Sequence, residues 1–130
     1  MNQKIGILDS GIGGTTVLKE IKKLLPKEDY IYYADSKNNP YGEKAEMQII
    51  KIVDDIVEFL IKEKKCKMIV IACNTATTKC MNYLKEKYQN IPIIGTVPAI
   101  KVACDNNYKN ILVLATPQTI DSLRTKELIT

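Results

Sequence analysis

The chain has 130 residues, of which 45% are hydrophobic and 26% are charged. This composition is typical of one globular domain, or of one domain with part of another. At this length folding buries about two thirds of the surface of the unfolded chain, so a core forms without disulfides or structural metals. Basic residues are scattered along the chain, and Arg124 is the only arginine. A nucleic-acid-binding protein is therefore disfavoured, because arginine forks read guanine edges and clamp phosphates.

The absence of histidine limits the chemistry that the chain can carry out. It removes the usual general base and the usual zinc ligand, so acid–base work falls to Cys, Asp, Glu, Lys or Tyr. The cysteines are too far apart for a zinc knuckle or a redox pair, at positions Cys66, Cys73, Cys80 and Cys104. The apolar run Ile5–Leu8 is too short for a signal peptide or a membrane span. We expect free thiols, no metal, no membrane association and a cytoplasmic location.

Strand and helix patterns alternate along the chain. Short apolar or β-rich runs predict five strands, at residues 5–8, 30–34, 68–72, 91–95 and 111–115. Apolar residues at helical spacing predict helices between them, at residues 17–25, 49–60, 74–88 and 98–104, with a further helix beginning near Ile120 and including Leu123 and Leu128. This alternation predicts an α/β fold with a mostly parallel sheet and helices on both faces.

Chemically useful residues follow the strands of the predicted sheet. Ligands bind outside the carboxyl ends of parallel strands, and the loops leaving those ends share one edge. Four loops carry the candidate residues, which are Asp9 and Ser10, then Tyr41 and Gly42, then Cys73, Asn74 and Thr75, and last Thr116 and Thr119. We expect one site to collect residues from all four loops.

Several of these residues allow two interpretations. Gly11, Gly13 and Gly14 could present backbone N–H groups to a phosphate or carboxylate, or could form a tight turn that lets a helix pack on a strand. Asp9 could cap that turn or accept a hydrogen bond from a bound ammonium group. The segment 35–44 could act as a flap over the site or be a solvated loop.

Cys73 is the strongest candidate for a functional residue, since it stands between a predicted buried strand and a predicted helix. A thiol at a helix N-terminus has a lowered pKa and more thiolate. The alternative is a small buried hydrophobe, as most free cysteines are. Polar neighbours favour a site, because a core would not need the hydrogen-bonding groups of Asn74, Thr75, Thr77 and Thr78. Cys66, Cys80 and Cys104 lack such neighbours and are expected to be buried.

Three motifs occur together in the order LDSGIGG at Leu8–Gly14, NPYG at Asn39–Gly42 and IACNTAT at Ile71–Thr77. With them the chain resembles the glutamate racemases of the cofactor-independent aspartate/glutamate racemase family. The resemblance runs over essentially the whole chain, through Pro92–Gly95 and the Thr116, Thr119, Ser122 pattern.

The resemblance implies interconversion of L-glutamate and D-glutamate with no cofactor and no metal, to supply D-glutamate for peptidoglycan. Two cysteines on opposite faces of the α-carbon would exchange the proton, one as thiolate base and one as thiol acid. Cys73 would be one of them. Asp9 and Ser10 would contact the substrate's amino group and assist proton transfer. The carboxylates would be held through backbone and hydroxyl donors of Tyr41, Gly42, Asn74, Thr75, Thr116 and Thr119.

The chain departs from the family pattern after Cys104, where the second cysteine and its Cys-Thr-His motif are not found. By the resemblance, residues 1–97 form an incomplete first α/β domain, and residues 98–130 begin a second, truncated one. Residues 1–130 would then be an N-terminal portion that racemises little or not at all alone, and a homodimer stays open.

Two alternatives stay open on the residues. The first is a racemase of the same family acting on aspartate or another small amino acid, since one methylene changes binding by only about 1 to 3 kcal/mol. The second is a non-catalytic module that binds a small anion at the Gly11–Gly14 turn.

Overall fold

A computed structural model describes residues 3–97, 99–122 and 127. Its centre is a sheet of four strands, β1 (Ile5–Asp9), β2 (Tyr30–Ala34), β3 (Met68–Ile71) and β4 (Ile93–Gly95). All neighbouring strands are parallel, in the order β2-β1-β3-β4. The mostly parallel sheet predicted from the sequence is confirmed.

Three longer helices connect the strands, and they are α1 (Thr15–Leu24), α2 (Glu46–Lys62) and α3 (Asn74–Lys87). Two short helices follow the sheet, α4 (Ile100–Asp105) and α5 (Pro117–Asp121). The segment between β2 and α2 contains two 3₁₀ turns, η1 (Ser36–Asn38) and η2 (Tyr41–Glu43). Helix α1 ends at Leu24, two residues before Pro26, because proline lacks the N–H that a continuing helix requires.

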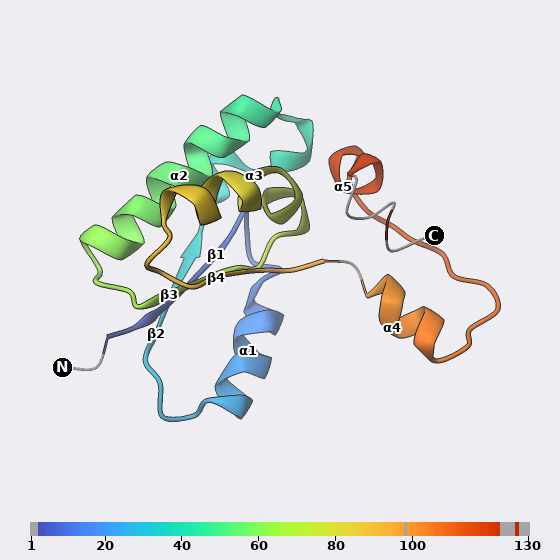
Figure 1. Ribbon diagram of the computed structural model, residues 1–130, viewed down its shortest axis with the longest axis horizontal. Coiled ribbons are helices and arrows are strands. Elements are labelled where there is room, and N and C mark those ends of the chain that lie inside the picture. The colour runs from blue at the N-terminus through green and yellow to red at the C-terminus, as the bar shows by residue number, and fades with distance from the viewer. Residues whose placement is uncertain (1–2, 98, 123–126, 128–130) are drawn as a thin grey trace.

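Helices cover both faces of the sheet, as predicted (Figure 1). On one face, α1 packs its apolar residues against Ile5, Ile7 and Val70. The opposite face carries the larger core, where α2 and α3 pack against Leu8 and its neighbours on β3. The strands are therefore buried from both sides, which explains their continuous apolar runs. No helix within the described residues is both long and apolar enough to cross a bilayer.

The fifth strand predicted at residues 111–115 is wrong, since the segment forms no strand. Leu112 and Leu114 are 84% and 86% exposed. A strand needs a neighbour to pair with, and no sheet strand of the described chain lies beside this segment. The helix expected near Ile120 is α5, which begins earlier; Leu123 and Leu128 lie outside the described residues, as does Pro98 at the expected start of the preceding helix.

Cysteine burial follows the predictions at two of three positions. Cys66 and Cys80 are buried in the larger core. Cys104 is exposed, so the prediction for it was wrong. The reason is that α4 lies beyond the end of the sheet. Ile100 at its start is buried, but Val102 is 61% exposed.

Candidate active site

A cavity of about 600 Å³ lies at the carboxyl edge of the sheet. Strands β1 and β3 end there, and helices α3 and α5 begin there. The cavity collects most of the predicted site residues, namely Asp9, Ser10, Cys73, Asn74, Thr75, Thr116 and Thr119. Because these residues come from segments more than 100 positions apart in the chain, the shared edge of the sheet brings them together.

Cys73 forms the junction between β3 and α3. Its backbone is extended, with φ −130° and ψ 122°, and it is the N-cap residue of the helix. The Sγ atom accepts a hydrogen bond from the Ala76 N–H at 3.5 Å and lies 4.0 Å from the Oγ of Ser10. A thiol in this position faces both the cavity and the first turn of α3, where N–H groups concentrate.

The pKa of the Cys73 thiol is raised, not lowered as the sequence suggested. Burial is the main cause, because a buried thiolate loses its hydration, and the nearby charge of Asp9 adds to it. The hydrogen bonds from Ala76, Ser10 and Thr75 lower the pKa but do not outweigh burial. The amides at the helix N-terminus therefore act as expected, but burial keeps the thiol protonated at neutral pH.

The Asp9 carboxylate caps the turn that follows β1. Its Oδ2 accepts the Gly14 N–H at 2.8 Å. The next amides are also used within the turn, since Thr15 and Thr16 donate to the carbonyls of Ile12 and Gly13. The Gly14 amide is therefore used within the turn. Asp9 is 6% exposed and borders the cavity.

Three threonine hydroxyls link the starts of α3 and α5. Thr75 Oγ1 and Thr116 Oγ1 are 2.7 Å apart, and Thr116 Oγ1 lies 3.1 Å from the hydroxyl of Thr119. Thr116 also caps α5 by accepting the Thr119 N–H. These hydroxyls hydrogen-bond to one another, and each can turn its hydrogen toward a bound acceptor.

Tyr41 and Gly42 do not line this cavity. Tyr41 is 2% exposed, and its hydroxyl donates to the buried Asp35 at 2.6 Å. Asn38 Nδ2 donates to both oxygens of the same carboxylate. The 35–44 segment is therefore anchored by two buried residues, with Tyr41 in the larger core. Other residues of the segment are exposed, namely Ser36, Lys37, Asn39, Pro40 and Glu43.

Sequence reasoning missed two residues at this site. Thr96 lines the cavity, and its N–H donates to Thr77 Oγ1 at 3.0 Å. It directly follows β4, so the rule that the carboxyl edge carries ligands could have found it. Tyr32 lies beneath Asp9, with its hydroxyl donating to the Gly11 carbonyl at 2.8 Å. The alternation of side chains along β2 was the available signal.

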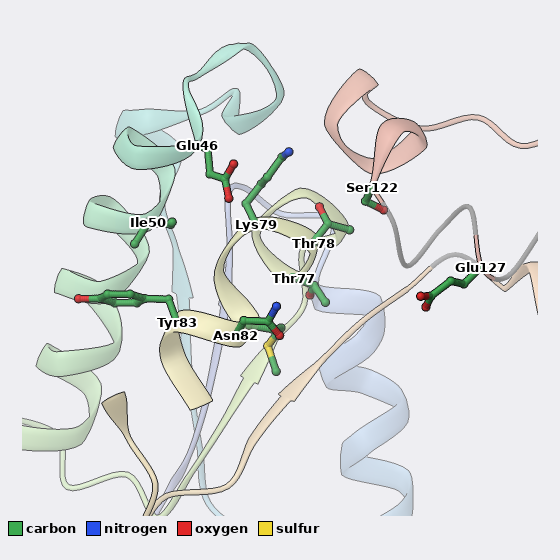
Figure 2. A pocket seen from close by; sticks show the side chains of 10 residues that line it. Glu46, Ile50, Thr77, Thr78, Lys79, Asn82, Tyr83, Ser122 and Glu127 are labelled. Carbon is green, nitrogen blue, oxygen red and sulfur yellow. The ribbon is translucent and has the colours of Figure 1, made fainter. Parts of the chain in front are cut away.

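A second cavity, of about 730 Å³, lies along the outer side of α3. Figure 2 shows Thr78, Lys79 and Asn82 of α3 beside Glu46 of α2, with Ser122 across from them. None of the predicted site residues lines this cavity. Among the residues of the described chain, Cys73 therefore borders the first cavity and not this one.

The comparisons with known proteins point to one kind of enzyme, although no family model matches the chain. The curated glutamate racemase of Clostridium botulinum strain Alaska E43 is 47% identical over 129 residues, which cover 98% of this chain and 50% of that protein. The glutamate racemase of Fusobacterium nucleatum is 49% identical over 123 residues, covering 92% of this chain and 46% of that protein.

Solved structures agree with the sequence matches. Escherichia coli glutamate racemase, in complex with L-glutamate and the activator UDP-MurNAc-ala, superposes with a TM-score of 0.89 at 40% identity, covering 99% of this chain and 48% of that one. The Francisella tularensis enzyme in complex with D-glutamate gives 0.80 at 37% identity, covering 98% and 49%. The chain spans about half the length of the curated relatives it matches. In sequence and in fold, the chain is thus similar to one half of a glutamate racemase, and the N-terminal portion indicated by its motifs fits this match.

Proposed function

We propose that this chain carries one half of an amino-acid racemase site that acts on glutamate, with Cys73 as one of two proton-exchanging thiols. The single observation that carries the proposal is the position of Cys73. Its Sγ stands at the N-cap of α3, at the edge of the cavity, 4.0 Å from the Oγ of Ser10 and near the Asp9 charge. Relatives of matching fold are named glutamate racemases. One of them was solved with L-glutamate and another with D-glutamate.

In the proposed proton transfer, the α-proton moves from the substrate to Cys73. The thiolate of Cys73 takes the α-proton, so a C–H bond breaks and an S–H bond forms. The electron pair left on the α-carbon is delocalised into the α-carboxylate. A thiol on the opposite face then protonates the carbon, which inverts it.

The raised pKa of the Cys73 thiol fits a site that is activated by its substrate. Asp9 contributes to raising this pKa through its negative charge. A bound amino acid brings an ammonium group, which can donate hydrogen bonds to Asp9 and Ser10. Neutralising the Asp9 charge removes that contribution and favours the thiolate only when substrate is present.

Hydroxyl and backbone donors suit the substrate carboxylates. The residues lining the cavity include neither lysine nor arginine, so charge-assisted clamps are absent from the described lining. We assign this role to Asn74, Thr75, Thr116 and Thr119. The Tyr41 hydroxyl is engaged by Asp35, and neither Tyr41 nor Gly42 lines the cavity, so we do not assign this role to them.

The division of the chain supports a second half for the site. Within the described residues no segment after Gly95 joins the sheet. We propose that residues 1–97 belong to a first domain and residues 98–130 to the start of a second, which would supply the opposing thiol. The complete protein would make D-glutamate for peptidoglycan in the cytoplasm.

The test is exchange of the α-proton in deuterated water, followed by NMR or mass spectrometry, for L-glutamate and D-glutamate separately. We expect the chain to wash deuterium into one enantiomer and Cys73→Ser to abolish that exchange. Cys104→Ser, an exposed thiol away from the cavity, is the matched control and should retain it. Exchange that survives Cys73→Ser would refute the role of this thiol.

Aspartate and inorganic phosphate provide the comparison arms. Faster exchange with aspartate than with glutamate would indicate that aspartate is the substrate. An increase in Tm with phosphate, together with no exchange of any amino acid, would favour an anion-binding module.

A further inference from the structure

Tyr32 has no role in the proposed chemistry, although its hydroxyl lies close to Asp9 and to the turn that follows β1. It lies on β2, opposite Ile7 of β1, and belongs to the core on the α1 face of the sheet. Its ring packs among apolar neighbours, so a phenylalanine would serve the packing equally well. Its hydroxyl, however, extends to the turn after β1, where it donates to the Gly11 carbonyl at 2.8 Å.

The same hydroxyl lies 3.4 Å from the Oδ2 of Asp9. That oxygen also accepts the Gly14 N–H at 2.8 Å. One carboxylate oxygen, one backbone amide and one phenol therefore meet at a single point. The second oxygen of Asp9 receives neither of these hydrogen bonds, and Asp9 borders the cavity.

Space around this point is tight. A Cβ placed on Gly14 would lie 2.9 Å from the Tyr32 hydroxyl, and equally close to the Cβ atoms of Asp9 and Ala72. Real Cβ atoms do not approach other atoms so closely. The backbone of the turn at Gly14 is therefore in close contact with Asp9, Ala72 and the phenol.

We propose that Tyr32 is a positioning residue of the racemase site, whose hydroxyl fixes the Ser10–Gly14 turn and so aims Asp9 and Ser10 at the substrate beside Cys73. The inference rests on the proposed function. It assigns to Tyr32 no contact with substrate, since Tyr32 does not line the cavity.

The phenol keeps its proton across the working pH range. Burial, and then the charge and hydrogen bond of Asp9, raise the pKa of Tyr32 to about 12. At neutral pH the group is therefore a permanent donor, and it can hold the Gly11 carbonyl while the charge on Asp9 changes.

The test compares Tyr32→Phe with Tyr30→Phe. Tyr30 is on the same strand and the same face, and its hydroxyl donates to the Leu25 carbonyl, away from the site. We expect Tyr32→Phe to slow α-proton exchange by roughly 10- to 100-fold, because small misplacements of a catalytic group have large effects. Tyr30→Phe should leave the rate unchanged.

A double-mutant cycle separates positioning from general destabilisation. If Tyr32 acts through Asp9, its substitution should have little further effect in an Asp9→Asn background. Independent, multiplying effects of the two substitutions would overturn the proposal.

A second measurement does not depend on activity. Hydrogen exchange of the Gly14 amide, compared with amides of β1, should speed up by roughly tenfold in Tyr32→Phe, as expected for loss of one ordinary hydrogen bond. Unchanged protection of Gly14 would refute the positioning role. If the wild-type chain exchanges no α-proton, the proposed function fails, and the amide measurement alone decides whether Tyr32 holds the turn.

Discussion

Cys73 and Asp9 line the same cavity, and the charge of Asp9 adds to the burial that raises the pKa of the Cys73 thiol. Burial and the Asp9 carboxylate both raise the pKa of the Cys73 thiol. The thiolate carries a negative charge, so a neighbouring negative charge disfavours it and a neutral amide does not. The protonation state of this thiol is therefore set by its surroundings and not by its place at a helix N-terminus alone.

This leads to a prediction on thiol reactivity. In a Cys104→Ser background, Cys73 should react slowly with iodoacetamide at pH 7, and the rate should rise with pH through a pKa above the ordinary thiol value. Asp9→Asn should lower that pKa and speed alkylation at pH 8. Mass spectrometry of the Cys73 peptide measures the rate.

Cys73→Ser provides the labelling control for that experiment, since no adduct should form at position 73. An apparent pKa below that of an ordinary thiol would contradict the account of burial, as would slower alkylation of Cys73 in Asp9→Asn.

At the level of elements, the close approach of β4 to α3 determines how the chain leaves the sheet. A Cβ on Gly95 would lie 2.5 Å from Thr77 Cγ2 and 3.1 Å from its Oγ1. The same Oγ1 accepts the Thr96 N–H at 3.0 Å, while Thr96 Oγ1 donates to the Ile71 carbonyl at 3.2 Å. The end of β4 is thus held to β3 and α3 at the rim of the site.

We predict that Gly95→Ala lowers the free energy of unfolding by about 1–3 kcal/mol, the usual effect of an added methyl group in a packed interior. Adding Thr77→Ser should recover much of the loss, because serine lacks the clashing Cγ2 and keeps the hydroxyl. Urea unfolding followed by circular dichroism measures both variants. Gly13→Ala, where the added Cβ meets its nearest neighbour at 3.6 Å, serves as the control. A Gly95→Ala variant as stable as wild type would disprove the clash.

A second contact between elements joins α2 to the end of α3. Asp54 accepts hydrogen bonds from Tyr83, Lys87 and Tyr88, the last two at 2.6 Å. Burial alone would raise the pKa of Asp54, but these three donors outweigh it and lower the pKa. A carboxylate with a lowered folded-state pKa stabilises the fold above its unfolded pKa, and loses that stabilisation as the pH falls through the folded value.

The pH dependence of Asp54→Asn tests this contact. We expect the variant to be less stable than wild type by about 1 kcal/mol at pH 7, a modest value because Lys87 is partly exposed and screened. The difference should begin to shrink as the pH falls below about 4, the ordinary pKa of an unfolded aspartate, and should disappear below the lower folded pKa. Asp55→Asn, whose partner Lys51 is highly exposed, should show no such difference. A constant difference from pH 7 to pH 3 would exclude the charge as the cause.

At the level of the whole molecule, the described chain presents one thiol to the cavity. Cys73 lines it, whereas Cys66 and Cys80 are buried in the core and Cys104 lies on α4. Inversion at carbon needs an acid and a base on opposite faces. The leucines of residues 111–115 are also exposed, although apolar side chains are usually covered in a folded core.

The corresponding prediction concerns the purified 130-residue chain. It should exchange the α-proton of one glutamate enantiomer and convert little or none into the other, as followed by chiral chromatography over hours. Substantial racemisation in both directions by this chain would show that one thiol, with another group, is sufficient.

The sequence by itself determined the local structure of this protein and the residue types at its site. Apolar runs predicted β1 to β4, and helical spacing predicted α1 to α3, because these patterns are local. The motifs around Asp9 and Cys73 predicted a thiol beside a carboxylate at one edge of the sheet. The cavity at the ends of β1 and β3 agrees with that prediction.

Tertiary structure decided what depends on neighbours distant in sequence. The segment 111–115 has the pattern of a strand, but pairing needs a partner strand. The hydrogen-bond partner of the Tyr41 hydroxyl cannot be read from the sequence. In the fold, that hydroxyl donates to Asp35. The raised pKa of Cys73 and the place of Tyr32 under Asp9 follow from burial and packing across strands. Desolvation and three-dimensional contact set these properties, and neither is encoded in the spacing of residues along the chain.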